Sequence, residues 1–267
     1  MIQNNIMPEG WDNVVSTLDG NNINEVINNQ TTLQGIVTDC DDDFNLHIDL
    51  GNYKGMMPRS EIEGINLQRN GLPKTNLCTG KVNKFVQFKV KNIEDDGTAI
   101  LSRKAVQNEA LNWIKNDLKV GDIVTGIVKR VESYGVFIEI GGGVVGLAHI
   151  EDLSVARIKS AFERVSIGQK LEVMIKAIDK ETGKLILSYK ELLGTWEENA
   201  DKFNVGQKAK GIVRETEKHK NGIFIELLPN LVGMAEYEDG LEYGQEVNVY
   251  IKRIDYERRK VKLLVLS

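Results

Sequence analysis

Cysteine and histidine are scarce in this 267-residue chain, with two and three copies respectively. Cys40 and Cys78 alone cannot form a disulfide framework or a zinc cluster, so the sequence predicts a protein of the reducing cytoplasm. We interpret both thiols as small, half-buried side chains. The histidines stand in non-equivalent positions, and the chain lacks a phosphate-binding loop, a Cys-x-x-Cys pair and a His-Glu-x-x-His motif. We therefore expect no enzyme activity, no cofactor and no metal site.

Long apolar runs are also absent. No stretch of about 18 apolar residues exists, which excludes a membrane-spanning helix and a membrane partner. Residues 1–10 lack the basic flank and apolar centre of a secretory signal. The chain has 34 basic and 39 acidic residues, so it is not a strongly basic protein. Among the segments that carry the repeat described next, only residues 118–194 hold more basic than acidic side chains, which favours this segment for attracting a polyanion.

An internal repeat sets the predicted architecture. The tripeptide Gly-Ile-Val begins at Gly35, Gly126 and Gly211, at intervals of 91 and 85 residues. After each copy the same features recur: an alternating strand, a glycine-containing turn, a β-rich run, an acidic turn residue and a closing strand. Short strands separated by glycine turns are typical of a small all-β barrel. We therefore predict three barrels, although chain length alone suggests two domains.

The segments between and before the repeats have other patterns. Residues 104–117 and 190–202 contain few β-branched residues and place apolar side chains at helical spacing, which predicts a short linker helix in each. Residues 1–29 are rich in Asn and hold four acidic and no basic residues. Here we expect a short helix from about Pro8 to Leu18 and loose order elsewhere. The predicted organisation is an acidic extension at 1–29, a barrel at 30–104, a linker helix at 105–117, a barrel at 118–190, a linker helix at 191–203 and a barrel at 204–267.

The middle repeat carries a specific succession of motifs. It reads Val-Gly-Asp-Ile-Val-Thr-Gly-Ile-Val from Val120, Ser-Tyr-Gly-Val-Phe-Ile-Glu-Ile from Ser133, Gly-Leu-Ala-His-Ile from Gly146 and Ile-Asp-Lys-Glu-Thr-Gly-Lys-Leu-Ile-Leu-Ser from Ile178. These motifs, in this order, resemble the S1 domain, the RNA-binding branch of the OB fold. The segments that follow Leu101 and Leu187 resemble the inter-domain segments of the bacterial ribosomal S1 family. The resemblance covers residues 30–267 and implies an all-β fold with short linker helices, namely three tandem S1-type OB-fold barrels of five strands.

The resemblance implies a nucleic-acid face in the middle repeat. Its two aromatics, histidine, aspartate and basic residue correspond to Tyr134, Phe137, His149, Asp179 and Lys184. Residue parity agrees in part, because the aliphatic residues of 136–140 share one parity and Phe137 shares the other with a glutamate. We therefore expect Phe137 to point outward beside a carboxylate. An outward phenyl ring is poorly explained as core and well explained as a platform for an unstacked base.

Other interpretations of these residues stay open. A lone histidine such as His149 is often satisfied by local hydrogen bonds, and only the family match favours a binding role. Asp179 equally suits fixing the tight turn before the last strand. Lys184 and Arg130 are suited to phosphate contacts. A solvated sheet edge is the alternative for both residues, and it is the favoured interpretation for Arg130.

The third repeat retains part of this face. The matching residues are Phe224, Asp255 and Lys260. Asn221 replaces the first aromatic, and Glu236 replaces the histidine, where its charge should repel phosphate. A longer loop at 218–220 adds two lysines that partly compensate. We expect a weaker, auxiliary RNA surface here.

The first repeat departs furthest. Phe44 and His47 take the aromatic positions, but Pro58 replaces the histidine, and three consecutive aspartates at 41–43 stand beside Phe44. Such carboxylates suit either a divalent cation or a solvated acidic turn, and we favour the turn because no regular ligand loop follows. This repeat is expected to contact protein rather than RNA, and the resemblance implies proteins of the small ribosomal subunit as partners.

The leading functional hypothesis is binding of single-stranded RNA, chiefly mRNA, at the small ribosomal subunit in the manner of the S1 family. One alternative is a non-ribosomal regulator of mRNA stability or translation. Another is a protein-interaction scaffold, favoured by the near-neutral charge and the altered first repeat.

Overall fold

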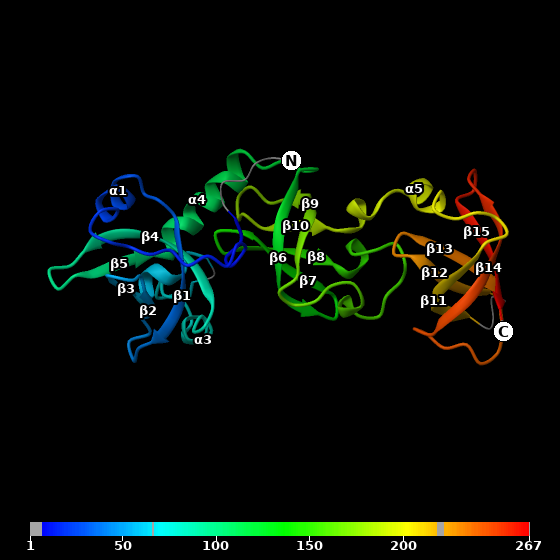
Figure 1. Ribbon diagram of the computed structural model, residues 1–267, viewed down its shortest axis with the longest axis horizontal. Coiled ribbons are helices and arrows are strands. Elements are labelled where there is room, and N and C mark those ends of the chain that lie inside the picture. Colours follow the sequence, from blue (N-terminus) through cyan, green and yellow to red (C-terminus); the bar gives the residue numbers. More distant parts are fainter. Residues whose placement is uncertain (1–6, 66, 218–221, 267) are drawn as a thin grey trace. The chain divides into compact units, whose positions relative to one another are not determined.

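The computed structural model describes residues 7–65, 67–217 and 222–266 (Figure 1). The chain divides into two compact units. The first unit consists of Met1–Ile127, Ile138–Gly146 and Ala177–Leu185. The second unit consists of Val128–Phe137, Leu147–Lys176 and Ile186–Ser267. The division runs through the middle barrel. No helix in the described ranges is long and apolar enough to cross a membrane.

Within the described residues, fifteen strands form three closed barrels of five strands each, which confirms the predicted fold class. The first barrel contains β1 (Leu33–Cys40), β2 (Leu46–Asp49), β3 (Lys54–Met57), β4 (Phe85–Ile93) and β5 (Thr98–Ser102). The second contains β6 (Ile123–Glu132), β7 (Gly135–Gly141), β8 (Val144–His149), β9 (Lys170–Ile178) and β10 (Leu185–Ser188). The third contains β11 (Lys208–Glu217), β12 (Gly222–Leu228), β13 (Leu231–Glu236), β14 (Glu246–Asp255) and β15 (Lys260–Leu266). In each barrel the third and fifth strands pair in parallel, so the repeat is one of topology as well as sequence.

Short helices accompany the strands within the described residues. They are α1 (Ile23–Asn28), α2 (Arg59–Ile62), α3 (Thr75–Thr79), α4 (Arg103–Asn116), η1 (Ile150–Asp152), η2 (Ala161–Glu163), η3 (Lys190–Leu193) and α5 (Trp196–Ala200). The first predicted linker helix is confirmed by α4, which the Ser102 side chain caps by accepting a hydrogen bond from the Ala105 amide at 3.0 Å. The second linker is interrupted where Gly194 adopts a φ of 84°, so η3 and α5 replace one helix.

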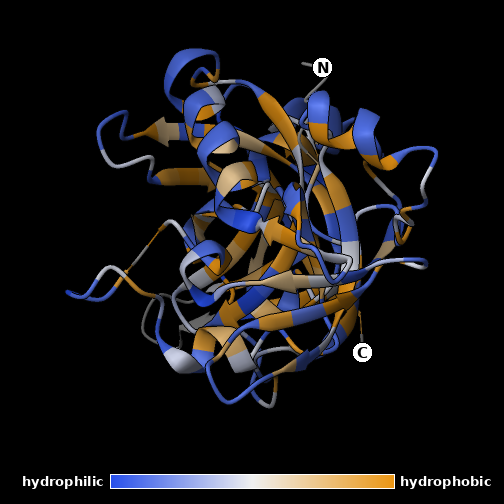
Figure 2. Ribbon diagram, turned by 90° about the vertical axis from the view of Figure 1, so that its left-hand side faces the viewer, coloured by the Kyte–Doolittle hydropathy of each residue, from blue (hydrophilic) through white to orange (hydrophobic). Residues whose placement is uncertain are grey.

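Hydrophobic and hydrophilic residues alternate along many of the strands, as Figure 2 shows. Burial follows the same alternation along β9 and β14, because successive side chains point to opposite faces of a strand. Each inward row fills a barrel core. Cys40 is half-buried as predicted, whereas Cys78 is fully buried in the first core, so the expectation of half burial is wrong for that thiol.

The glycine of the Gly-Ile-Val repeat has the same packing role in all three barrels. A β-carbon added to it would overlap the side-chain methyl Cγ2 of an isoleucine on the next strand. The distances are 2.7 Å for Gly35 and Ile48, 2.5 Å for Gly126 and Ile138, and 2.4 Å for Gly211 and Ile225. All three isoleucines are buried, so the repeat marks where two strands approach too closely for any side chain.

Substitution of Gly211 by alanine is therefore expected to lower the free energy of unfolding by about 1–3 kcal/mol, since the added methyl overpacks a closed core. Chemical denaturation measures the change. Gly20→Ala is the control, because no atom lies within 4 Å of its added β-carbon, and it should stay within about 0.5 kcal/mol of wild type. Equal stability of both variants would contradict the packing role.

The N-terminal segment is extended rather than helical, so the predicted helix from Pro8 to Leu18 is wrong. The Ser16 amide donates to the Gln34 carbonyl and the Leu18 amide to the Leu50 carbonyl, each at 2.7 Å. Leu18 is buried against the first barrel. The barrel supplies backbone partners that a local helix would otherwise provide, and residues 14–17, which include three β-branched side chains, favour extended backbone. The segment is thus a cover over the first barrel rather than a loosely ordered extension.

A buried ion network fastens this cover to α4. The side chains of Arg103 and Glu9 are 2% and 3% exposed, and they meet through hydrogen bonds of 2.6 and 3.2 Å. Arg103 also donates to Glu63 at 3.2 Å. The Glu9 carboxylate accepts a further hydrogen bond from the Gln87 amide at 3.2 Å. Burial alone would lower the pKa of Arg103, but the charge of Glu9 raises it, so the guanidinium stays ionised.

A second buried network lies within the second unit, between the segment that connects β8 with β9 and the third barrel. Glu226 on β12 accepts hydrogen bonds of 2.5 Å from both Arg164 and Arg214. Arg214 also pairs with Glu163, which in turn accepts from the Tyr243 hydroxyl at 3.0 Å. Burial alone would lower the pKa of Arg214, but Glu226 raises it. The segment at 154–165 is mostly irregular and contributes the single turn η2.

Candidate nucleic-acid interface

An aromatic pair stands at the start of β7. Val136 and Ile138 are completely buried, whereas Phe137 between them is half-buried and lies outside the apolar core, as its parity predicts. Tyr134 is 47% exposed, and its ring meets that of Phe137 edge to face, with centroids 6.2 Å apart. Two aromatic rings are thus available at one surface of the second barrel.

Gly135 makes this arrangement possible. A β-carbon at this position would lie 2.4 Å from the Ala148 carbonyl oxygen and 3.1 Å from the His149 Cα, so β7 and β8 approach closely only because residue 135 is glycine. The Tyr134 carbonyl accepts a hydrogen bond of 2.9 Å from the Ile150 amide just beyond β8. The backbone therefore brings Tyr134, Phe137 and His149 into one part of the structure.

Arg130, which the sequence suggests for phosphate contacts, adds a cation to the aromatic pair. Its guanidinium carbon lies 4.1 Å from the centre of the Phe137 ring, in the geometry of a cation–π contact. The side chain is largely exposed, and its Nε lies 3.4 Å from Glu132. The side chain is solvated, as the simpler interpretation expects, and it also lies over the aromatic ring. No sequence pattern shows this contact.

His149 ends β8 with an exposed ring. Its Nδ1 accepts a hydrogen bond of 3.5 Å from the Glu151 amide and lies 3.8 Å from the Glu151 carboxylate. With Nδ1 as acceptor, the neutral ring carries its proton on Nε2. The local hydrogen bond expected from the simpler interpretation is therefore present, and the binding role of His149 stays a prediction.

Asp179 and Lys184 flank the turn between β9 and β10, in the first compact unit. The Asp179 carboxylate accepts hydrogen bonds from the backbone amides of Glu181 and Thr182 at 3.0 and 3.1 Å, and from the Thr182 hydroxyl. The hydrogen bond from that hydroxyl holds the pKa of Asp179 below its usual value. Asp179 thus fixes the turn, whereas a role toward a base is still only predicted. Lys184 is exposed at the end of the turn.

The expectation that Glu139 faces outward beside Phe137 is wrong. Its side chain is buried, and one carboxylate oxygen accepts hydrogen bonds from the Glu9 amide at 2.8 Å and the Gly143 amide at 2.9 Å. Parity places Glu139 on the correct face of the strand, but the N-terminal segment covers that face at residue 139. The local sequence pattern cannot show this cover.

The third barrel holds fewer elements of the same face. Phe224 is half-buried on β12, directly opposite the exposed Met234. Asp255 accepts hydrogen bonds from Arg253 at 2.9 Å and from the Arg258 amide at 3.0 Å, so its carboxylate is engaged locally. Lys260 is exposed and pairs with Asp255 in the strand register. Asn221 and the loop at 218–220 lie outside the described residues.

The first barrel offers no comparable platform among its described residues. Phe44 adopts a φ of 64°, packs against the core and is covered by Arg59, 5.1 Å from the ring centre. Asp41 accepts hydrogen bonds from the Asn45 amide at 2.8 Å and contacts His47 at 3.0 Å. The His47 hydrogen bond is the main cause that lowers the pKa of Asp41. These contacts match an acidic turn, and within the described ranges no group of three or more potential ligands could hold a metal ion.

Comparison with known proteins agrees with this geometry. Residues 117–190 match the family described as the S1 RNA binding domain. Small ribosomal subunit protein bS1 of Staphylococcus aureus is 34% identical over 223 residues, covering 74% of this chain and 56% of the relative. The bS1 protein of Staphylococcus haemolyticus is 30% identical with the same coverage.

The solution structure of GSP13 from Bacillus subtilis shares 26% identity, covers 33% of this chain and 74% of that chain, and gives a TM-score of 0.29. The chain spans little more than half the length of the bS1 relatives that it matches. Three closed barrels, the S1 match of the second and the similarity to bS1 that extends over most of the sequence show one family: the chain is a tandem S1-domain protein resembling bS1.

Proposed function

We propose that this protein binds single-stranded RNA, chiefly mRNA, at the small ribosomal subunit. The observation that carries the proposal is the aromatic pair of Tyr134 and Phe137 on the barrel that matches the S1 RNA binding domain. The bS1 relatives are proteins of the small ribosomal subunit by name, which supports the ribosomal location and would place the protein in the cytoplasm. We also propose the domain boundaries predicted above, since the ranges 30–104, 118–190 and 204–267 each enclose five strands.

The binding mechanism follows from the chemistry of the second barrel. A base stacks on the exposed Tyr134 ring, and a base stacks on Phe137 either in place of Arg130 or together with it. Each stacked base contributes about 1–3 kcal/mol to the binding free energy. Arg130 and Lys184 contact phosphates, while His149 and Asp179 supply hydrogen bonds to the nucleotide. Stacking accepts every base, so sequence preference is weak. Affinity falls as the salt concentration rises. The slope of log K against log salt is about −0.7 for each phosphate neutralised.

The test is titration of fluorescent single-stranded RNA with the full chain. Phe137→Ala is expected to weaken binding about 5- to 150-fold, which corresponds to about 1–3 kcal/mol of lost stacking. Phe162→Ala is the matched control, because Phe162 is 59% exposed in the same barrel but lies on η2, outside the aromatic pair. Equal binding by wild type and Phe137→Ala would remove this site. Absence of binding by the wild type would favour the scaffold.

The first barrel is proposed to contact protein of the small subunit, because Phe44 is covered and Asp41–Asp43 would repel a polyanion. Co-sedimentation with isolated small subunits separates this ribosomal role from the alternative. A protein that binds RNA but is absent from that fraction is a free regulator of mRNA stability or translation.

A further inference from the structure

A row of exposed side chains crosses the outer face of the third barrel. Tyr250 on β14 lies opposite Leu264 on β15 and, on its other side, opposite Lys208 on β11. Tyr250 is 36% exposed and Leu264 is 42% exposed. The residues directly before and after each of them along the strand are buried or half-buried. An aromatic ring, a leucine and a lysine thus lie side by side on one surface.

Two more lysines belong to this surface. Lys262 stands two residues from Leu264 on an exposed position of β15. Lys252 is exposed where the register of β14 shifts, and it lines the same hollow as Leu264. Within the described residues, none of Lys208, Lys252 and Lys262 forms an ion pair. Lys210 differs, because it pairs with Glu246 at 2.7 Å on the same sheet. The surface therefore combines exposed apolar groups with three lysines that form no ion pair with a described residue, one of which, Lys252, shares a hollow with two glutamates.

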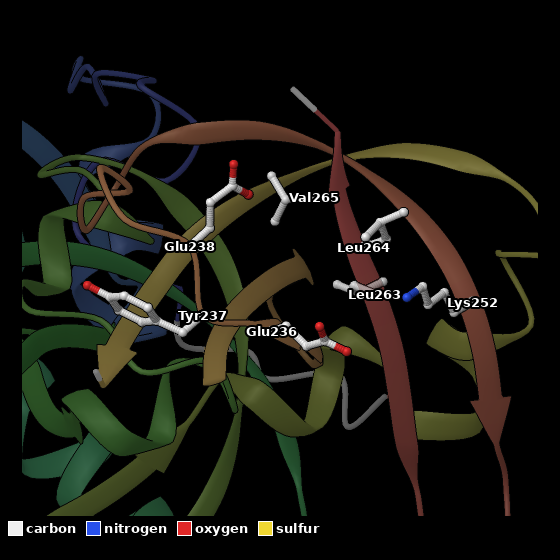
Figure 3. A pocket seen from close by; sticks show the side chains of 7 residues that line it. All are labelled: Glu236, Tyr237, Glu238, Lys252, Leu263, Leu264 and Val265. Carbon is white, nitrogen blue, oxygen red and sulfur yellow. The ribbon is translucent and has the colours of Figure 1, made fainter. Parts of the chain in front are cut away.

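A hollow of about 220 Å³ adjoins the row (Figure 3). It opens where β13 leaves β15, beyond the pairing of Met234 with Lys262. Residues 263–265 and Lys252 line one side, and residues 236–238 line the other. A hollow of this size is smaller than the ~300–1,000 Å³ of most small-molecule sites, which favours one group of a longer chain over a free ligand.

Charge decides which kind of chain fits. An exposed apolar patch marks an interaction site, and here it is interleaved with unpaired lysines, which suit the phosphates of a nucleic acid. The glutamates at 236 and 238 repel phosphates from the β13 side of the hollow, which Lys252 shares, so they favour phosphates at Lys208. Exposed Tyr250 provides the π-face that a single-stranded base requires. The nucleic-acid face that the S1 resemblance implies for this barrel has Glu236 in place of the histidine, and its Asp255 is hydrogen-bonded to neighbouring residues. That face therefore does not account for the exposed apolar groups and lysines of β14 and β15.

We propose that Tyr250, Leu264, Lys208, Lys252 and Lys262, here called the β14–β15 face, form a second surface for single-stranded RNA. A base stacks on Tyr250, its ribose packs on Leu264, and the three lysines contact the neighbouring phosphates. This inference rests on the proposed function, and it assigns the third barrel a surface distinct from the aromatic pair of the second.

The experiment titrates the full chain with two RNAs at low salt. One has about 30 nucleotides, enough for two barrels at ~4–16 nucleotides each, and the other is short enough for one. Tyr250→Ala is expected to weaken binding of the long RNA about 3- to 10-fold and to leave the short RNA, held by the second barrel, unchanged. Tyr250→Phe should retain wild-type affinity.

Salt dependence provides an independent measurement. Lys252→Gln and Lys262→Gln are each expected to reduce the slope of log K against log salt by about 0.7 for the long RNA. Lys210→Gln is the matched control, because this lysine is already paired with Glu246. Thermal unfolding of every variant confirms that the third barrel is folded.

The outcomes separate this inference from the proposed function. If wild type binds no RNA, both fail. If Phe137→Ala weakens binding but Tyr250→Ala matches wild type with the long RNA, only the β14–β15 face is refuted. If Tyr250→Ala retains RNA binding and loses binding to isolated small-subunit proteins, the face is a protein-docking surface and the proposal is overturned.

Discussion

Replacement of Glu9 by alanine is expected to lower the free energy of unfolding of the first barrel by about 3–5 kcal/mol. Glu9 neutralises Arg103, whose side chain is 2% exposed, and it also accepts a hydrogen bond from the Gln87 amide. Its removal leaves a buried guanidinium that keeps its hydrogen bonds to the Glu63 carboxylate and the Ile62 carbonyl, each at 3.2 Å. Breaking a buried ion pair on one side costs far more than the pair contributes, because the remaining charge stays desolvated.

Hydrogen exchange with mass spectrometry measures this effect barrel by barrel. Glu25→Ala is the control, because Glu25 is an exposed carboxylate of the same segment and its removal should change stability by no more than about 0.5 kcal/mol. Glu9→Gln keeps the shape and loses the charge, so it should fall between Glu9→Ala and wild type. If Glu9→Ala and Glu25→Ala behaved alike, Arg103 would have to be stabilised by other groups.

Glu226→Ala is expected to have an effect of similar size, about 3–5 kcal/mol, in the third barrel. The Glu226 carboxylate is 5% exposed and forms ion pairs with Arg164 and Arg214, whose side chains are 7% and 4% exposed. Without it, two guanidiniums remain close together in a buried site, where their repulsion adds to the cost of desolvation. Glu163 can compensate only one of them, because it already pairs with Arg214.

The measurement is again hydrogen exchange, followed over β11 and β12. Glu246→Ala serves as the matched control, since its ion pair with Lys210 is exposed on the same barrel and contributes no more than about 1 kcal/mol. Increased exchange should extend to residues 154–165, which the network holds. A loss in Glu226→Ala no greater than that in Glu246→Ala would show that solvent reaches both arginines.

Patterns of short range predicted the barrels well. The Gly-Ile-Val repeat fixed the number of barrels, because each glycine marks a close approach of two strands that only glycine permits. Parity placed Val136 and Ile138 in the core and Phe137 outside it. The helical spacing before Trp113 predicted α4, because one apolar face of that segment packs against the first barrel.

Contacts between distant residues could not be predicted in the same way. Charged residues such as Glu139, Arg214 and Glu226 suggest solvated positions, and their burial depends on partners elsewhere in the chain. The β-branched residues at 14–17 favour the extended backbone of the N-terminal cover, but its place over the first barrel depends on hydrogen bonds to that barrel. The sequence suggested Arg130 for phosphate contacts, but its contact with Phe137 gave no local signal and is revealed only by the structure.

The distance along the chain between Glu9 and its partners has a consequence for biosynthesis. Arg103 lies 94 residues after Glu9, and Glu139 lies 130 residues after it. At a synthesis rate of ~5–20 residues per second, the ribosome exposes Glu9 several seconds before its counter-ion exists. The five strands of the first barrel are synthesised during that interval, but the ion pair that fastens the N-terminal cover cannot yet form. The first barrel is therefore completed only when the start of α4 has emerged.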